Sequence, residues 1–388
     1  MRRWPLFAAL LLALAPAAST AADPFEIDAL VPVTGPQAFL GQGIARAIAA
    51  VEAAANRTGG IRGRPVKFVI HDDAGNPQLD VQFANAVIAR KASVILGPAQ
   101  VGGCRAIVPL LKDGPLLYCL SPGLHPERGT FAFSANSSTN DALAALIRYL
   151  VERGIKRVAT ITTTDATGQD ADLAIDGALA AAKAADLVVD REHFNASDLG
   201  VPAQIARMKI ASPEWVIVWT TGTALGTALR GIKDAGMDVS IITGNGNSNR
   251  EMLAHFADVL PKELVFPTNS SQLPPDRIDD PATRRAVQSY LAAMNGVGVA
   301  KPDESNAGSF DTIVLIVDAF RKLGTNATPA QLRDYVANLK TFVGVMGPYD
   351  FPAIPQRGIG QSSVVVTRWD PARDGWVALS KLGGAPLR

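Results

Sequence analysis

Few side chains in this sequence could do chemistry, and they are widely spread. The densest group is His71-Asp72-Asp73, after a predicted strand. It could hold a metal, although acids in that position more often cap a helix or accept hydrogen bonds from loop amides. Ser121 and His125 are close in sequence, but nothing nearby orients the imidazole as a base needs. We therefore predict a protein that is not an enzyme and has no metal site and no cofactor.

The two cysteines, Cys104 and Cys119, are too few for a disulfide scaffold or a four-cysteine zinc site. The first is predicted to open a helix and the second to end the next strand. In a parallel β/α layer both positions lie at the same edge of the sheet, so a disulfide is geometrically reasonable. Two buried free thiols are the alternative, and the sequence leaves both open. Neither cysteine has a context that indicates catalysis.

The N-terminus has the layout of a secretory signal. Arg2-Arg3 precedes an apolar stretch at residues 6–15, and small residues follow up to Ala22. The apolar part is too short to span a bilayer, and no later segment has eighteen consecutive apolar residues. We predict a cleaved signal peptide at residues 1–22 and a product that is free in the periplasm, where a disulfide is permitted.

Length and charge restrict the possible partners. The chain has 388 residues, enough for two domains, and 37 Lys and Arg residues against 36 Asp and Glu residues. The net charge of +1 and the absence of a basic cluster argue against nucleic acid and acidic membrane surfaces as partners.

Apolar runs alternate with helix-period stretches along most of the chain. Strands are predicted at 25–34, 66–71, 94–97, 116–121, 158–163, 187–192, 215–219 and 240–243, with a tail strand at 362–369. Helices are predicted at 41–56, 78–90, 106–112, 141–153, 170–185, 202–211 and 224–235. This alternation predicts an α/β fold of parallel sheets with helices on both faces. Eight such units are too many for one ordinary sheet, so we expect two.

Three polar or proline-rich segments interrupt the alternation, at residues 131–140, 266–280 and 347–358. We interpret them as three crossings of the chain between two lobes. The first lobe is then formed by residues 23–137 and 272–347, and the second by residues 138–271 and 348–388. Three crossings suit a hinge, because a few loop residues can absorb a closing rotation.

A succession of short motifs carries a family resemblance. The chain reads PVTGP at 32–36, NRTGGIRG at 56–63, ILGP at 95–98, LSPG at 120–123 and GMDVSIITGNG at 236–246. In this order and spacing the sequence resembles the periplasmic leucine/isoleucine/valine-binding protein family, the type I solute-binding components of ABC importers. The resemblance implies two doubly wound parallel-sheet lobes, a small-molecule ligand and an ABC permease in the inner membrane as partner. We also expect a monomer that binds no nucleic acid.

The loops after the strands are the expected ligand-binding elements, because ligands of open α/β sheets bind at the carboxyl ends of strands. By resemblance, a ligand carboxylate would be held by the loop after ILGP and by the loop at 121–125. Three second-lobe loops would face them, with an apolar wall before the first helix. The predicted ligand-binding residues are Phe39, Leu40, Gln100, Val101, Gly102, Ser121, Gly123, His125, Asp165, Thr167, Thr221 and Asn245.

The sequence departs from the family pattern where amino-acid binders carry an acid that pairs with the α-ammonium. The loop at 244–247 offers Asn245 and Asn247 and no carboxylate. Asp165 is the nearby acid, and its position is more typical of a helix cap. We therefore expect a neutral, hydroxyl-lined pocket for a small polar solute or a carboxylate without an ammonium group, such as an aromatic or aliphatic acid. Two alternatives stay open: a branched-chain or other amino acid as ligand, and an extracytoplasmic sensor for a membrane signalling partner.

Overall fold

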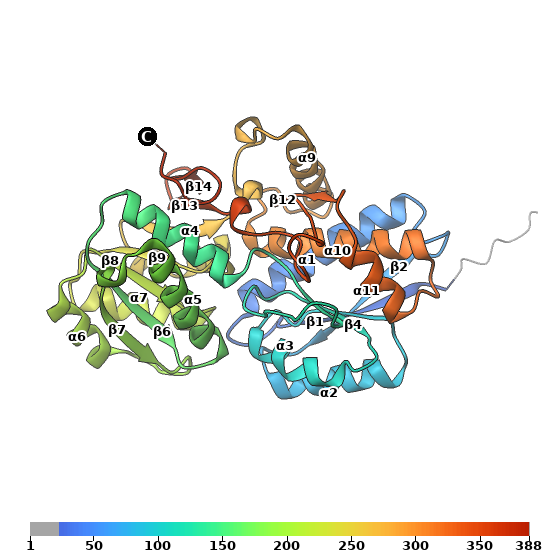
Figure 1. Cartoon of the computed structure of the whole chain (residues 1–388), viewed down its shortest axis with the longest axis horizontal. Coiled ribbons are helices and arrows are strands. Elements are labelled where there is room, and N and C mark those ends of the chain that lie inside the picture. The colour runs from blue at the N-terminus through green and yellow to red at the C-terminus, as the bar shows by residue number, and fades with distance from the viewer. Residues whose placement is uncertain (1–22, 388) are drawn as a thin grey trace, which may run out of the picture.

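Two β-sheets organise the part of the chain that the computed structural model describes, residues 23–387. Each sheet lies within its own layers of helices, and the chain passes back and forth between them (Figure 1). The predicted signal peptide at residues 1–22 lies outside the described residues. The predicted α/β class is confirmed.

The first sheet has the strand order β2-β1-β3-β4-β5, with every neighbouring pair parallel. Its strands are β1 (Phe25–Val31), β2 (Val66–Asp72), β3 (Val94–Leu96), β4 (Leu116–Cys119) and β5 (Ala132–Ser134). The helices of this first lobe are α1 (Ala38–Arg57), α2 (Pro77–Ala89), α3 (Val101–Ile107), α9 (Pro281–Asn295), α10 (Glu304–Leu323) and α11 (Pro329–Ala337). Neighbouring side chains of β1 enter different cores: Ala29 packs with α1 and α10, whereas Leu30 packs with α2 and α3.

The second sheet has the strand order β14-β13-β10-β9-β8-β6-β7. Its strands are β6 (Val158–Thr163), β7 (Val188–Phe194), β8 (Trp215–Trp219), β9 (Ser240–Thr243), β10 (Leu264–Thr268), β13 (Val365–Asp370) and β14 (Gly375–Ala378). The helices of this second lobe are α4 (Thr139–Glu152), α5 (Ala166–Ala182), α6 (Pro202–Ala211), α7 (Thr223–Asp234) and α8 (Arg250–His255). Side chains of α4 and α5 fill the core on one face, and those of α6, α7 and α8 fill the core on the other. Strands β13 and β14 form an antiparallel hairpin against β10, so this sheet is mixed rather than wholly parallel.

Short elements complete the described chain. A two-residue hairpin joins β11 (Val343–Gly344) to β12 (Gly347–Pro348). Single 3₁₀ turns are found at η1 (Val108–Leu110), η2 (Ala185–Leu187), η3 (Asn245–Asn247), η4 (Ala257–Val259), η5 (Ser270–Gln272), η6 (Pro275–Arg277) and η7 (Gln361–Ser363).

Helix α3 begins earlier than predicted. The sequence favours a start at 106, because Gly102-Gly103 is a poor helix former. The helix nevertheless begins at Val101, with Gln100 as its N-cap residue. A Cβ atom on Gly103 would lie 1.9 Å from Oδ2 of Asp80, so the glycine permits a close approach of α2 and α3. Tertiary packing therefore overrides local propensity here.

The three crossings follow β5, β10 and β12 in the chain. The first predicted segment, 131–140, is only partly irregular, because it contains the buried strand β5. After β12, the side chains of Tyr349, Phe351 and Ile359 still pack in the core of the first lobe. The chain enters the second sheet at Val365, later than the expected boundary at 348.

Within the described residues, α1 is long and apolar enough to cross a membrane by length and composition. Its apolar face is used inside the protein. Ile44, Ala47, Ile48 and Val51 are buried in the core of the first lobe, where α1 packs on α10. This packing is typical of a core helix.

Candidate binding site between the lobes

A cavity of about 70 Å³ lies where the carboxyl ends of strands from both sheets meet. In the first lobe, the loops after β3 and β4 reach it, together with the start of α1 and the start of α10. In the second lobe, the loops after β6, β8 and β9 reach it. Strand ends leave backbone and side-chain polar groups free for a ligand, so this is the expected position for a binding site.

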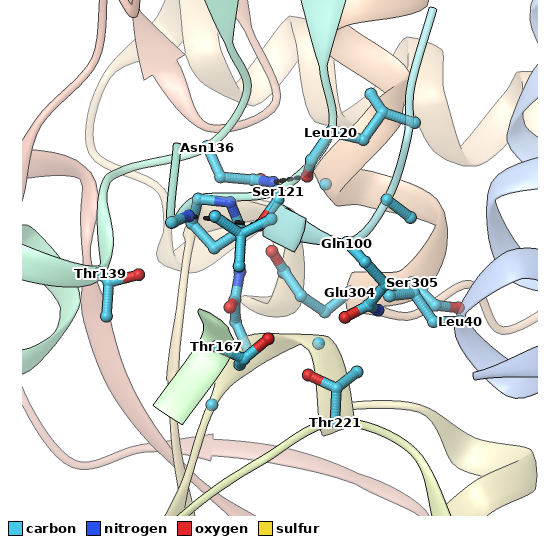
Figure 2. Close-up of a pocket in the computed structure, with 18 of the residues that line it drawn as sticks. Leu40, Gln100, Leu120, Ser121, Asn136, Thr139, Thr167, Thr221, Glu304 and Ser305 are labelled. Carbon is cyan, nitrogen blue, oxygen red and sulfur yellow. Dashed lines mark hydrogen bonds between the residues drawn. The ribbon is translucent and has the colours of Figure 1, made fainter. Parts of the chain in front are cut away.

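The cavity lining is mostly small, hydroxyl and amide side chains, with two acids (Figure 2). The first lobe contributes Leu40, Ile44, Ala99, Gln100, Val101, Leu120, Ser121, Pro122, Gly123, Glu304, Ser305, Gly308 and Ser309. Asn136 and Thr139 come from the first crossing and the start of α4. The second lobe contributes Thr167, Asp170, Trp219, Thr220, Thr221, Gly244, Asn245 and Gly246.

Eight of the twelve residues predicted from the sequence line this cavity. They are Leu40, Gln100, Val101, Ser121, Gly123, Thr167, Thr221 and Asn245. They come from five separate loops and α1, so the predicted convergence of strand-end loops is present in the structure. Their contact with a ligand stays a prediction.

The other four predicted residues lie outside the lining. Phe39 packs against the core of the second lobe, and Gly102 lies between Pro77 and Ala166. The Asp165 carboxylate caps α5 by accepting hydrogen bonds from the backbone amides of the first turn, as its position in the sequence indicates. His125 Nε2 lies 2.8 Å from Asp170 Oδ1, so this imidazole pairs with the opposite lobe instead of entering the cavity.

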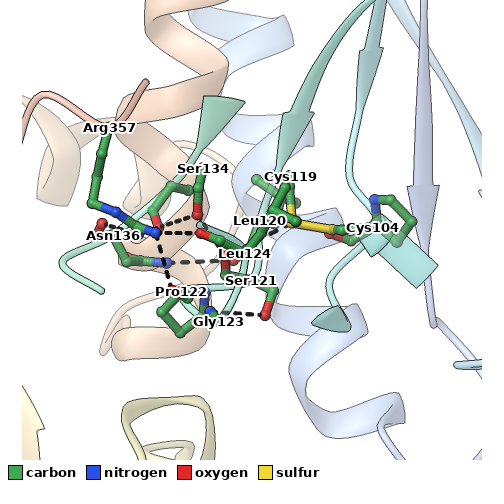
Figure 3. Close-up of a disulfide and its surroundings, with 12 residues drawn as sticks. Cys104, Cys119, Leu120, Ser121, Pro122, Gly123, Leu124, Ser134, Asn136 and Arg357 are labelled. Atoms are coloured by element: carbon green, nitrogen blue, oxygen red, sulfur yellow. Dashed lines mark hydrogen bonds between the residues drawn. A yellow bond between two sulfur atoms is a disulfide. The ribbon is translucent and has the colours of Figure 1, made fainter. Parts of the chain in front are cut away.

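Arg357 holds the loop after β4 in place (Figure 3). Its side chain is buried, and its guanidinium donates hydrogen bonds to the carbonyls of Pro122, Leu124, Ala135 and Asn136 at 2.5–3.1 Å. Burial lowers the pKa of this guanidinium to about 10. The residue lies between β12 and the third crossing, so a segment far along the chain fixes the cavity wall.

A disulfide joins Cys104 of α3 to Cys119 at the end of β4 (Figure 3). The structure thus favours the bridge over the two free thiols that the sequence left open. The bond connects two of the first-lobe segments that line the cavity, the start of α3 and the loop beginning at Leu120. It therefore restricts their relative movement.

Asn247 has the corresponding role in the second lobe. It is fully buried, and its Oδ1 accepts a hydrogen bond from the backbone N–H of Gly222 at 3.1 Å. Its Nδ2 donates to the carbonyl of Thr220 at 2.7 Å and to the hydroxyl of Thr243 at 2.8 Å. One side-chain amide therefore holds the loops after β8 and β9 together.

The start of α10 is the largest part of the lining that was not predicted; Asn136, Thr139 and Asp170 were not predicted either. Glu304, Ser305, Gly308 and Ser309 face the cavity, and these positions lie on one side of the helix. The signal in the sequence is the run of polar and small residues at helical spacing before the apolar part of the same helix. That run lies about 180 residues after the loop at 121–125, and only the fold brings the two together.

Glu304 makes the cavity different from the neutral pocket that we expected. The residue is 3% exposed, and both its carboxylate oxygens accept hydrogen bonds from Asn269 Nδ2, at 2.7 and 2.9 Å. Burial, and then the neighbouring charge of Asp303, raise the pKa of Glu304 well above its usual value. The lining therefore contains a carboxyl side chain that our expectation of a neutral, hydroxyl-lined pocket did not include.

The two lobes touch on both sides of the cavity. On one side, Asp170 of α5 pairs with His125 and also with Arg105 of α3, at 3.4 Å. On the other, Arg46 of α1 pairs with Glu251 of α8 at 3.0 Å. The structure therefore shows the lobes closed on each other, with the cavity between them.

The His71-Asp72-Asp73 group is used within the fold. His71 Nε2 lies 2.7 Å from Asp28 Oδ1, Asp72 accepts a 2.6 Å hydrogen bond from the Thr34 hydroxyl, and Asp73 accepts one from the backbone of Gly75. Across residues 23–387, no group of three or more histidine, cysteine or acidic residues is arranged to hold a metal ion.

Comparison with known proteins identifies the class to which this two-lobed architecture belongs. Residues 24–375 match the family described as Periplasmic binding protein, and the chain belongs to that family. "Leu/Ile/Val-binding protein homolog 3" of Brucella melitensis is 25% identical over 318 residues, 78% of this chain and 84% of that protein. A leucine-, isoleucine-, valine-, threonine- and alanine-binding protein of Pseudomonas aeruginosa is 28% identical, over 65% of this chain and 69% of its own length.

Solved structures share the fold at lower identity. An extracellular ligand-binding receptor from Rhodopseudomonas palustris has a TM-score of 0.81 at 18% identity, covering 92% of this chain and 99% of its own. A branched-chain amino acid transporter protein from Streptococcus pneumoniae, in complex with isoleucine, has a TM-score of 0.76 at 18% identity, with coverages of 92% and 99%. A solute-binding protein from R. palustris, in complex with benzoate, has a TM-score of 0.74 at 17% identity, with coverages of 94% and 97%.

The comparisons point to the family that the motifs indicate. The chain is a solute-binding protein of the periplasmic binding protein family, and the two sequence relatives are named as Leu/Ile/Val-binding proteins. Proteins of this family are periplasmic, bind small molecules and work with ABC permeases. The relatives are binding proteins for transport, so the prediction that the chain is not an enzyme is confirmed.

Proposed function

We propose that this chain captures a small polar solute in the periplasm by closing its two lobes around it, and that the closed form then docks on an ABC permease. The observation that carries the proposal is the cavity between the strand ends of both sheets, with lobe-to-lobe contacts on either side of it. The layout of residues 1–22 supports export.

For the closing units we propose the two sheets with their cores. The first unit takes residues 23–137 and 272 to about 359, and the second takes the rest of the chain. The third boundary is placed after Ile359 because that side chain still packs in the first core. Closure would then need backbone rotation only in the three crossings.

Ligand binding can close the lobes only to the extent that the ligand prefers the closed form. The lining supports such a preference, because residues from both lobes line the same cavity and a ligand would contact both only after closure. The ordered loops held by Arg357 and Asn247 support binding as well, since preorganised groups lose little freedom when a ligand arrives.

The proposal is tested by small-angle scattering and thermal unfolding of the mature chain with a panel of branched-chain amino acids, short acids, benzoate and small amides. We expect at least one compound to reduce the radius of gyration and to raise the melting temperature. At a hundred times Kd, a ligand that binds only the folded state stabilises it by about 2.7 kcal/mol. Profiles unchanged by the whole panel would count against a closing binder of small polar solutes.

A further inference from the structure

The first-lobe wall of the cavity presents a carboxyl group that lacks an ionic partner. Glu304 begins α10 and is almost fully buried, and its recorded side-chain hydrogen bonds come from the neutral amide of Asn269. In the described part of the chain, no lysine, arginine or histidine lies within salt-bridge distance of it. A buried carboxylate without a countercharge has a large desolvation cost. Its position at the cavity wall therefore indicates that a ligand supplies the partner.

Two further oxygens at the cavity lack hydrogen-bond donors. Asn136 is 6% exposed and its Oδ1 accepts no hydrogen bond, while its Nδ2 donates to the carbonyl of Leu120. Asp170 is 4% exposed, and its Oδ2 has no partner although its Oδ1 pairs with His125. Buried polar atoms are almost always hydrogen-bonded in native proteins, so these acceptors indicate where a ligand donates.

The lining has no matching side-chain cation. Among the described residues that form the cavity wall there is no lysine, arginine or histidine. An anionic head group would therefore face two acids and an unpaired amide oxygen without a charged side chain to neutralise it. A group rich in N–H donors would satisfy the same oxygens.

We infer that the cavity binds a small solute whose head group carries N–H donors, an ammonium or a primary amide, and that Glu304 is the specificity-determining residue that accepts them. The inference rests on the proposed function and names the class of solute. It reverses our expectation of a ligand without an ammonium group. The acid lies on the first lobe at the start of α10, whereas the family pattern places the acid of amino-acid binders in the loop that corresponds to 244–247.

The size of the cavity limits the rest of the solute. At about 70 Å³ it is less than half the volume of the roughly 150 Å³ apolar cavity known to take up benzene. A head group with a short aliphatic chain therefore fits the closed form better than an aromatic acid. Leu40 and Ile44 supply the apolar contact for such a chain.

The two head groups would act differently on Glu304. Burial and the nearby carboxylates of Asp303 and Asp311 raise its pKa, while Asn245 and Asn269 act in the opposite direction. Arg250, on α8, directs its backbone N–H to Asp303. An ammonium would supply the missing countercharge and lower the pKa of Glu304, whereas a neutral amide would only donate hydrogen bonds to its oxygens.

The test uses pairs of probes that differ in their N–H groups. Calorimetric titration compares propionamide with propionate, which has nearly the same shape, and L-alanine with propionate, which lacks the ammonium group. We expect the amide or the amino acid to bind at least tenfold more tightly than propionate. The probe that gains affinity over propionate identifies the head group.

Glu304→Gln keeps the size of the side chain and removes its charge. We expect it to weaken binding of L-alanine at least tenfold if that is the preferred probe, because the countercharge to the ammonium is lost. A preferred amide should lose less, because the glutamine Oε1 still accepts an N–H hydrogen bond. Glu26→Gln, an exposed acid on β1 paired with Lys67, is the matched control and should leave affinity unchanged. Melting temperatures of both variants show that they are folded.

Propionate or benzoate binding more tightly than every N–H donor, with Glu304→Gln unaffected, would overturn the inference. Scattering would still show closure in that case, so the proposed function would survive. The wild-type probe pairs decide the question even if the variant does not fold.

Discussion

The two walls of the cavity are held in place by different means. The first-lobe wall is fixed by a disulfide and by a buried guanidinium that comes from the segment after β12. The second-lobe wall is fixed by a neutral side-chain amide, Asn247, which bonds only within its own lobe. The comparison suggests that the first wall depends on distant segments of the chain and the second on local ones.

This difference has a physical consequence for the hinge. Arg357 lies just before the third crossing, in a segment that still packs in the first lobe, and it bonds to the β4 loop and to the first crossing. Its hydrogen bonds therefore tie this segment and the first crossing to the β4 loop, and all three should move together. Asn247 makes no such connection, so the second-lobe loops should move as one unit with their sheet.

Replacing Arg357 by methionine should have the largest effect. The substitution removes the guanidinium donor from four carbonyls, and we expect the free energy of unfolding to fall by about 4 kcal/mol. Urea unfolding followed by circular dichroism measures the change. Arg285→Met, an exposed site on α9, should change stability by less than about 0.5 kcal/mol. Equal decreases in the free energy of unfolding of the two variants would show that the hydrogen bonds of Arg357 contribute nothing special to stability.

Removing the disulfide tests the other support of the first wall. The two cysteines are 15 residues apart, and closing a loop of that length is expected to stabilise the fold by about 3 kcal/mol. Cys104→Ser with Cys119→Ser should lower the free energy of unfolding by that order. A reducing agent should destabilise the wild type and have no effect on the double variant. A wild type that is insensitive to reductant would contradict the bridge.

In the second wall, Asn247→Ala should lower the free energy of unfolding by about 2 kcal/mol, because a buried N–H and a buried carbonyl lose their partner. Hydrogen exchange should show faster opening of the loops after β8 and β9, while the β4 loop stays protected. Asn295→Ala, at an exposed position, is the control. If the β4 loop opened as well, the two walls would not be independent.

Asp80, on α2 next to α3, should make the stability of the first lobe depend on pH. We expect no such dependence in the second lobe. Burial, and then the charge of Asp73, raise the pKa of Asp80 from 3.8 to about 8. Between these values the folded chain binds more protons than the unfolded chain, so stability falls as pH rises from about 4 to 8. We expect Asp80→Asn to reduce this fall by at least about 1 kcal/mol, measured by urea unfolding at pH 5 and pH 8. An unchanged pH profile would rule out Asp80 as its source.

Up to residue 243 the sequence predicted the order of strands and helices well, because β-α alternation with short turns produces strong periodicity. There it missed β5, whose three buried residues are too few to show a period, and it placed the start of α3 too late because Gly103 serves a contact with Asp80. Between residues 244 and 361 it assigned no helix or strand, whereas the structure has α8, β10, α9, α10, α11, β11 and β12 there. It also missed β14.

The site was predicted only where loops follow strands. Ser121 and Thr221 could be assigned because the carboxyl ends of parallel strands converge. Glu304 could not, because it opens a helix that packs on the first lobe from a distant part of the chain. His125 was misplaced for a related reason: its partner, Asp170, belongs to the other lobe, and sequence alone does not show which groups meet on closure.

The smallest expected effect concerns the ion pair between Arg46 and Glu251. Their side chains are 34% and 50% exposed, and an exposed pair is worth about 0.2–1 kcal/mol. Because the pair joins the lobes, its loss should act on closure and leave the stability of each lobe unchanged. We expect Glu251→Gln to weaken binding of the preferred probe less than about threefold, a change of about 0.6 kcal/mol.

The comparison variant is Asp170→Asn, which removes a buried acid paired with His125 and Arg105 and should weaken binding more. Calorimetric titration at low and high salt separates the two, since only the exposed pair is strongly screened. A larger loss of affinity for Glu251→Gln than for Asp170→Asn would mean that the contact between α1 and α8 stabilises the closed form more than the contacts of Asp170 do.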